Sequence, residues 1–167
     1  MKKINFLFLI IFATVSFVQA QDKKPASPKA EVEGSIGATK VKIVYCQPSA
    51  RGRKIMGGLV PFGEVWRTGA NAATTIEFDK AVKIENKDLP AGKYELFTIP
   101  NENEWTIIIQ KYGKQMGAFA YQKENDVLRV NVKPAKTDTF VETFNIAIGK
   151  DDVELKWENT LVAFKVK

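Results

Sequence analysis

The chain has 167 residues, of which 45% are hydrophobic and 11% aromatic, a composition that is typical of one globular domain and excludes extended disorder. Its formal net charge of +6 comes from basic residues interspersed with acids, which is typical of a solvated sheet face and not of a nucleic-acid-binding surface. A single cysteine and the lack of histidine exclude an intramolecular disulfide, a histidine-ligated metal and a Ser-His or Cys-His nucleophile. We therefore expect no metal, no cofactor and no nucleic-acid partner.

Residues 1–20 are predicted to be a cleaved signal peptide. Lys2 and Lys3 precede the apolar stretch Ile4–Val18, which is too short for a stable membrane span, and Ala20 supplies a small residue at the cleavage site. We expect an exported protein, periplasmic or extracellular, that keeps no transmembrane anchor after cleavage. Residues 21–33 combine prolines with small and charged residues and are predicted to be a flexible linker, followed by one domain over residues 34–167.

Alternating apolar and polar residues predict short β-strands along most of this domain. In the first clear example, Val41, Ile43 and Tyr45 fall on one face and lysines fall on the other, as in a half-buried strand. Residues 94–99 and 105–109 are apolar on both faces, as the central strands of a covered sheet are. Further alternating segments are 75–78, 82–85, 128–132, 140–148, 153–157 and 162–166.

The pattern of strands predicts the fold class. Helical periodicity is lacking over any stretch of about ten residues, which excludes a parallel βαβ architecture. About eight or nine short strands at this spacing are typical of antiparallel sandwiches. We predict an all-β fold, an antiparallel two-sheet β-sandwich of jelly-roll or immunoglobulin-like kind, with the strand order left open.

One long stretch interrupts the strands. Residues 48–53 contain a proline and a glycine that a central strand does not tolerate, and residues 57–71 are rich in glycine and also hold a proline, a tryptophan and an arginine. We interpret residues 48–71 as a long loop that the sandwich holds in place. Loops on a rigid scaffold carry function more often than sheet faces do.

Several motifs along the chain resemble a known family. They are Tyr45-Cys-Gln-Pro48, Arg51-Gly-Arg53, the segment GLVPFGEVWRTGAN at 58–71, LPAGKY at 89–94, FTIP at 97–100 and Trp157-Glu-Asn159. Together, and in this order from about Gly34 onward, they resemble the bacterial secreted family called domain of unknown function 2911. The resemblance implies an exported β-rich domain without assigned chemistry. The chain departs from the family pattern at Cys46-Gln47, where that pattern has Ser-Arg.

The loop also predicts a ligand site. Arginine offers a planar fork that suits carboxylate, sulfate or phosphate, and aromatic rings offer stacking faces for a sugar or another flat ligand. An asparagine beside them would orient a ligand by hydrogen bonds. We expect a small-molecule ligand, anionic or a glycan. The candidate ligand-binding residues are Tyr45, Arg51, Arg53, Trp66, Arg67 and Asn71.

Two other interpretations of the loop stay open. In a structural one, Trp66 closes an end of the sandwich, and Arg67 donates to backbone carbonyls or pairs with Glu64 or Asp79. In an enzymatic one, Glu64 with Asp79 or Glu77 forms a carboxylate pair, as in a glycosidase-like hydrolase. No spacing places two carboxyl groups face to face, so we expect a binding or structural module in preference to an enzyme.

Overall fold

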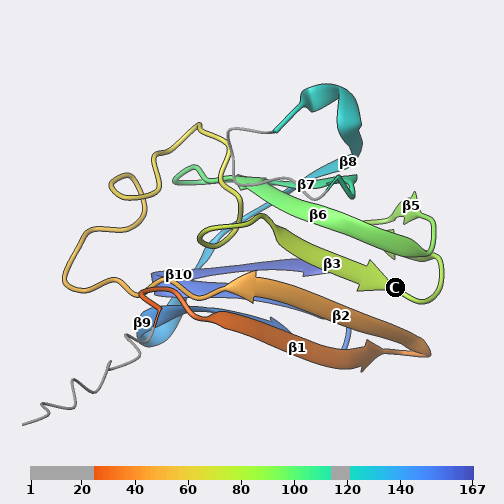
Figure 1. The fold of residues 1–167 in the computed structure, drawn as a ribbon, viewed down its shortest axis with the longest axis horizontal. Coiled ribbons are helices and arrows are strands. Elements are labelled where there is room, and N and C mark those ends of the chain that lie inside the picture. The colour runs from red at the N-terminus through yellow and green to blue at the C-terminus, as the bar shows by residue number, and fades with distance from the viewer. Residues whose placement is uncertain (1–24, 114–120) are drawn as a thin grey trace, which may run out of the picture.

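The structure is a computed structural model that describes residues 25–113 and 121–167, and within these ranges it is built almost wholly of β-strands (Figure 1). The predicted signal peptide, residues 1–20, lies outside the described residues. Across the same two ranges no helix is long and apolar enough to cross a membrane. The strands are β1 Lys29–Ile36, β2 Thr39–Cys46, β3 Thr74–Phe78, β4 Val82–Ile84, β5 Lys87–Leu89, β6 Gly92–Ile99, β7 Trp105–Lys111, β8 Asp126–Val132, β9 Ala135–Ile148 and β10 Asp152–Lys165.

The first layer is a six-stranded sheet in the order β1-β2-β3-β6-β7-β8, with every neighbouring pair antiparallel. Strands that follow one another in the chain lie side by side, except that the β4–β5 hairpin is inserted between β3 and β6. The sequence does not determine the strand order. The structure shows that this sheet is mainly a meander, in which consecutive strands are neighbours. Short turns suffice to connect such strands.

The second layer is made of β9 and β10, which lie behind the first sheet in Figure 1. Strand β10 folds back on itself: Glu158 has a φ of 55°, and the amide of Val166, just past the strand, donates to the carbonyl of Asp151 at 2.9 Å. A bridge between Ile84 and Val166 joins β4 to this layer. The predicted all-β, two-sheet antiparallel sandwich is confirmed.

The main core fills the space between the two layers. The predicted inward residues Val41, Ile43 and Tyr45 of β2 are all buried in it, and Phe144 and Trp157 face them from the second layer. Each such buried side chain contributes about 1.5–3 kcal/mol relative to exposure, which is how the alternating pattern drives the layers together. Aromatic contacts link the layers, for example between Tyr45 and Phe144, whose ring centroids lie 5.7 Å apart.

A smaller core covers the opposite face of the first sheet. Phe97 of β6 and Ile108 of β7 are buried there together with Ala73, and Val65 and Tyr121 pack against them. Val65 and Ala73 belong to the segment between β2 and β3. That segment therefore explains why β6 and β7 are apolar on both faces, as the sequence predicts.

The boundary of the predicted linker is corrected by β1, which begins at Lys29. Residues 29–33, expected to be flexible, pair with β2 along the edge of the sheet. Glu31 and Glu33 obscure the strand pattern because β1 is an edge strand with an exposed outer face, where both acids bind Lys42 at 2.5 and 2.7 Å. On the inner side, β1 passes so close to β9 that a Cβ on Gly34 would lie 3.2 Å from Ile148.

Candidate functional site

The segment between β2 and β3, residues 47–73, is fixed to both layers of the sandwich. Its first part runs beside β9: the amide of Phe144 donates to Pro48 at 2.9 Å, and the amide of Ala50 donates to Glu142 at 2.7 Å. The hydroxyls of Ser49 and Thr143 meet at 2.9 Å. These contacts add a short edge to the second layer and hold the Arg51–Arg53 turn that follows.

Trp66 attaches the second part of the segment to the first sheet. Its amide donates to the carbonyl of Thr98 at 2.7 Å, and the amide of Thr98 donates back at 2.9 Å. The indole enters the core, where it is only 9% exposed and stacks on Trp157 at 5.9 Å with an angle of 20° between the planes. Its Nε1 donates to the carbonyl of Gly69 at 3.1 Å, so the turn after Trp66 is tied to the buried ring.

A tightly constrained turn follows Trp66. Thr68 is buried at a φ of 54°, a region that β-branched residues rarely adopt. Its carbonyl accepts a hydrogen bond from the Thr74 hydroxyl at 2.6 Å, and its own hydroxyl lies 3.2 Å from that of Thr98. At Gly69 a Cβ would lie 3.0 Å from the carbonyl oxygen of Cys46, so the close approach of these backbones requires glycine. Surrounding contacts thus hold the turn in a strained conformation.

This turn forms one wall of a small cavity of about 210 Å³. Arg67 lines the cavity, and its guanidinium donates from Nη1 to the carbonyl of Asn71, another lining residue, at 2.9 Å. The side-chain amide of Asn71 reaches the carbonyl of Ser27 at 3.5 Å, on the segment that precedes β1. The cavity is lined by Pro48, Leu59, Val60, Trp66, Arg67, Gly69, Ala70, Asn71 and Trp157.

The arginines of this region keep their charges uncompensated by acids. Among residues 25–113 and 121–167, no carboxylate forms an ion pair with Arg51, Arg53 or Arg67. Arg51 donates to the carbonyl of Ala26 at 3.0 Å, and Arg53 donates to backbone carbonyls of its own turn at 3.0 and 2.8 Å. The contacts hold the guanidinium groups in place without neutralising them. One carboxylate nevertheless lies at this turn, because Glu142 accepts a hydrogen bond from the backbone amide of Arg51 at 2.8 Å.

The structure brings together some of the predicted site residues. Trp66, Arg67 and Asn71 line the cavity, whereas Arg51 and Arg53 lie in the turn beside β9 and are not part of its lining. Tyr45 faces the core with an exposed fraction of 4%. Its hydroxyl accepts a hydrogen bond from the amide of Ile146 at 3.1 Å, so its ring offers no open face to a ligand in this arrangement.

Sequence reasoning missed two parts of the cavity wall. Trp157 shows only the alternation of a core strand, and Leu59 lies in a glycine-rich stretch without any period. Leu59 nevertheless carries a signal: it is a large apolar residue between glycine and proline in a loop, where burial is hard to achieve. Its exposed fraction in the structure is 46%.

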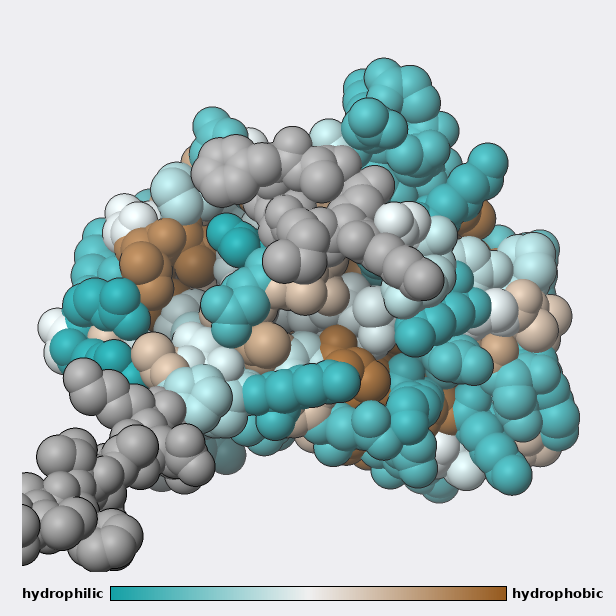
Figure 2. All heavy atoms as spheres, in the orientation of Figure 1, coloured by the Kyte–Doolittle hydropathy of each residue, from teal (hydrophilic) through white to brown (hydrophobic). Residues whose placement is uncertain are grey.

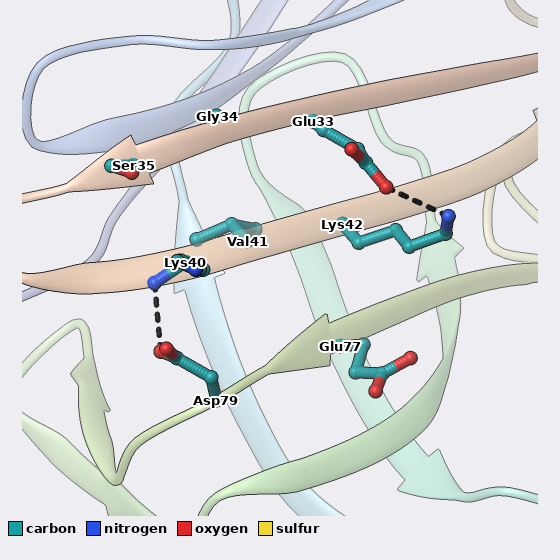
Figure 3. Close-up of a pocket in the computed structure, with 8 residues that line it drawn as sticks. All are labelled: Glu33, Gly34, Ser35, Lys40, Val41, Lys42, Glu77 and Asp79. Carbon is teal, nitrogen blue, oxygen red and sulfur yellow. Dashed lines mark hydrogen bonds and ion pairs between the residues drawn. The ribbon is translucent and has the colours of Figure 1, made fainter.

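A larger concavity of about 520 Å³ lies on the outer face of β1, β2 and β3 (Figure 3). Lys42 and Glu33 of its lining form an ion pair at 2.7 Å. Hydrogen bonds from Lys42 to Glu31 and Glu33 raise the pKa of the lysine well above its usual range. Asp79 accepts from the amide of Lys40 at 2.7 Å, and Glu77 lines the same concavity. Two of the acids considered for a hydrolase, Glu77 and Asp79, therefore lie here, whereas Glu64 lines neither this concavity nor the loop cavity.

Comparison with known proteins agrees with the motifs. Residues 27–166 match the model of a family described as "Protein of unknown function (DUF2911)". No curated protein and no solved structure matches the chain. The match covers both layers of the sandwich and the whole of the segment between β2 and β3. The chain therefore belongs to the DUF2911 family of proteins of unknown function.

Proposed function

We propose that this protein is an exported binding module that holds a small anionic ligand in the loop cavity. The observation that carries the proposal is the guanidinium of Arg67. Arg67 lines the cavity, its guanidinium forms no ion pair in the described part of the chain, and its one hydrogen bond there goes to the carbonyl of Asn71, which also lines the cavity. A guanidinium has five N–H donors, so most of them remain for a ligand carboxylate, sulfate or phosphate.

The loop is already ordered in the geometry that binding requires. Trp66 is paired with Thr98 through the backbone, and the turn at Thr68 is held by Thr74. Ordering a flexible loop on binding would cost affinity, and these contacts avoid most of that cost. Strained, over-determined backbone of this kind is concentrated at functional sites, which further supports a site here.

The hydrolase alternative has less support. None of the residues that line the cavity is an acid. Glu77 and Asp79 line the concavity on the outer sheet face, and Glu64 is exposed on the loop. A retaining or inverting glycosidase needs two carboxyl groups on opposite sides of one bond. We therefore propose a binding module in preference to a hydrolase.

Export is part of the proposal and rests on residues 1–20, with their basic start and apolar stretch. It is tested by expressing the full chain in a bacterium and determining the N-terminus and mass of the product from the periplasm. We expect a mature N-terminus at Gln21. Retention of the complete chain in the cytoplasm would contradict export and leave the cavity argument untouched.

Ligand binding is tested by titrating the purified protein with acetate, sulfate and glucuronate while following tryptophan fluorescence. Trp66 lies 6.3 Å from Trp105 and 5.9 Å from Trp157, so the indoles form one cluster that borders the cavity. We expect at least one anion to bind saturably, and Arg67→Gln to weaken its affinity about tenfold or more.

Arg53→Gln is the matched control. It removes the same charge from the same loop at a position outside the lining, so a specific site keeps its affinity in this variant. Equal weakening by both substitutions would show that only the general positive charge attracts anions. That result would overturn the proposed function, and so would the lack of saturable binding both by these three anions and by an aromatic carboxylate such as benzoate.

A further inference from the structure

We infer that the ligand of the loop cavity is a monoanion with a compact apolar body, such as an aromatic or short branched carboxylate, and not a polyhydroxylated sugar or a bare inorganic anion. This inference rests on the proposed function and names the class of ligand for the same site. It follows from how few polar groups the cavity offers and from where its apolar surface lies.

The cavity has little capacity for hydrogen bonding beyond one anionic group. Among the lining residues that the structure describes, Arg67 and Asn71 supply the only polar side chains apart from the two indole N–H groups. Both indole groups are already used: Trp66 donates to Gly69 at 3.1 Å, and Trp157 donates to the carbonyl of Glu142 at 3.2 Å. The indoles therefore present hydrocarbon to the cavity. The hydroxyls of a buried sugar would find few partners there, and an unpaired buried hydroxyl weakens binding.

The remaining wall is apolar, and part of it is exposed to water. Leu59 lines the cavity with an exposed fraction of 46%, beside Val60, which is buried. Figure 2 shows hydrophobic side chains at the surface of the loop region, on the left of the view, bordered by hydrophilic ones. An apolar ligand body placed against Leu59 would remove this surface from water, whereas sulfate or phosphate would leave it exposed.

The volume of the cavity and the charge of its lining further restrict the class of ligand. A cavity of about 210 Å³ lies below the range of about 300–1,000 Å³ in which drug-sized ligands bind, so one ring or one short branched chain fills it. Arg67 is the one cation in the lining, and a carboxylate matches its fork with two parallel hydrogen bonds. A single carboxylate on a small apolar body satisfies both features.

The test compares benzoate, benzyl alcohol, phosphate and glucuronate on the wild-type protein. We expect benzoate to bind at least tenfold more tightly than each of the other three. Benzyl alcohol keeps the ring and lacks the charge, whereas phosphate and glucuronate keep charge and lack the apolar body. Calorimetry measures the affinities without relying on indole fluorescence.

A pair of variants locates the apolar contact. Leu59→Ser is expected to weaken benzoate binding about three- to tenfold while leaving phosphate affinity unchanged, because only the ring covers this side chain. Phe140→Ser is the control: Phe140 is 54% exposed and lies outside the cavity lining, so benzoate affinity is expected to stay the same. Both residues are exposed in the wild type, and circular dichroism confirms that the variants fold.

The outcomes separate this inference from the proposed function. If phosphate or glucuronate binds as tightly as benzoate and Arg67→Gln removes that binding, the anion site stands and the apolar body is refuted. If benzyl alcohol binds as tightly as benzoate, or Leu59→Ser leaves benzoate affinity unchanged, the inferred ligand class is also refuted. If no probe shows binding that depends on Arg67, the proposed function fails as well.

Discussion

The indole of Trp66 lies on the indole of Trp157 with ring centroids 5.9 Å apart and planes 20° from parallel. Trp66 belongs to the segment between β2 and β3, and Trp157 belongs to β10, so this contact joins the loop to the second layer. Both residues also line the loop cavity. The contact therefore contributes both to the packing of the two layers and to the wall of the candidate site.

Replacing Trp66 with alanine should destabilise the protein by about 3–5 kcal/mol, because the ring is buried and its loss leaves a hole between the layers. Trp66→Phe should cost less, since most of the apolar volume stays. Urea unfolding of the three proteins measures the difference. A loss of less than about 1 kcal/mol for the alanine variant would mean that the loop can collapse over the hole.

Thr68 gives an unusual prediction, because glycine should be tolerated there better than valine. Thr68→Gly removes a Cβ from the left-handed region, a gain of about 1–2 kcal/mol that offsets the lost hydroxyl contact with Thr98. Its stability should therefore stay within about 1 kcal/mol of wild type. Thr68→Val keeps the strained Cβ and loses the hydroxyl, so it should lose about 1–2 kcal/mol. Thermal unfolding decides, and a glycine variant less stable than the valine variant would refute strain at this position.

Tyr45→Phe should separate folding from binding. The change leaves the buried amide of Ile146 without its acceptor and should cost about 1–3 kcal/mol of unfolding free energy. Affinity for benzoate should not change, because Tyr45 does not line the loop cavity. Unfolding in urea and calorimetric titration of the same variant test both halves. Weaker benzoate binding with unchanged stability would restore Tyr45 to the binding site.

The ion-pair cluster at the edge of the first sheet predicts a pH effect. A hydrogen bond from Lys42 lowers the pKa of Glu31 in the folded state, so the stabilising effect of the pair is present above the unfolded pKa of Glu31 and is lost as the pH falls through the folded value. Lys42→Met should therefore lower the melting temperature slightly at pH 7 and by less at an acid pH that lies below the folded pKa of Glu31. The cluster is exposed, so high salt should shrink the difference at pH 7. An equal loss at both pH values would point to packing of the lysine stem instead.

The sequence predicts best those strands that have one buried and one exposed face, because apolar and polar residues then alternate along the chain. Val41, Ile43 and Tyr45 alternate because β2 has the core on one side and water on the other. Phe97 and Ile108 indicate that the opposite face of the first sheet is buried as well, and residues of the segment between β2 and β3 pack against them there. These patterns are local, so one sequence is enough to find them.

What the sequence leaves out depends on contacts between distant segments. The sequence prediction missed the start of β1, because Glu31 and Glu33 make this segment resemble a charged linker. Both acids are tolerated in the strand because β1 lies at an edge of the sheet. A tyrosine at position 45 is compatible with stacking on a ligand and with packing in the core. Only its contact with Phe144 in the structure shows that it packs in the core. Leu59 and Trp157 meet at the cavity through the fold, and no spacing in the chain indicates that they do.

The bridge between Ile84 and Val166 has a consequence for the order in which the molecule folds. Backbone hydrogen bonds between Lys83 and Lys167, at 2.7 and 3.0 Å, continue this pairing. The strands β5 to β10 separate the two partners in the chain. Pairings between such distant segments form slowly, because a long stretch of chain must be closed into a loop before the contacts can form. We therefore expect β4 to join the second layer late in folding, after the hairpins between neighbouring strands.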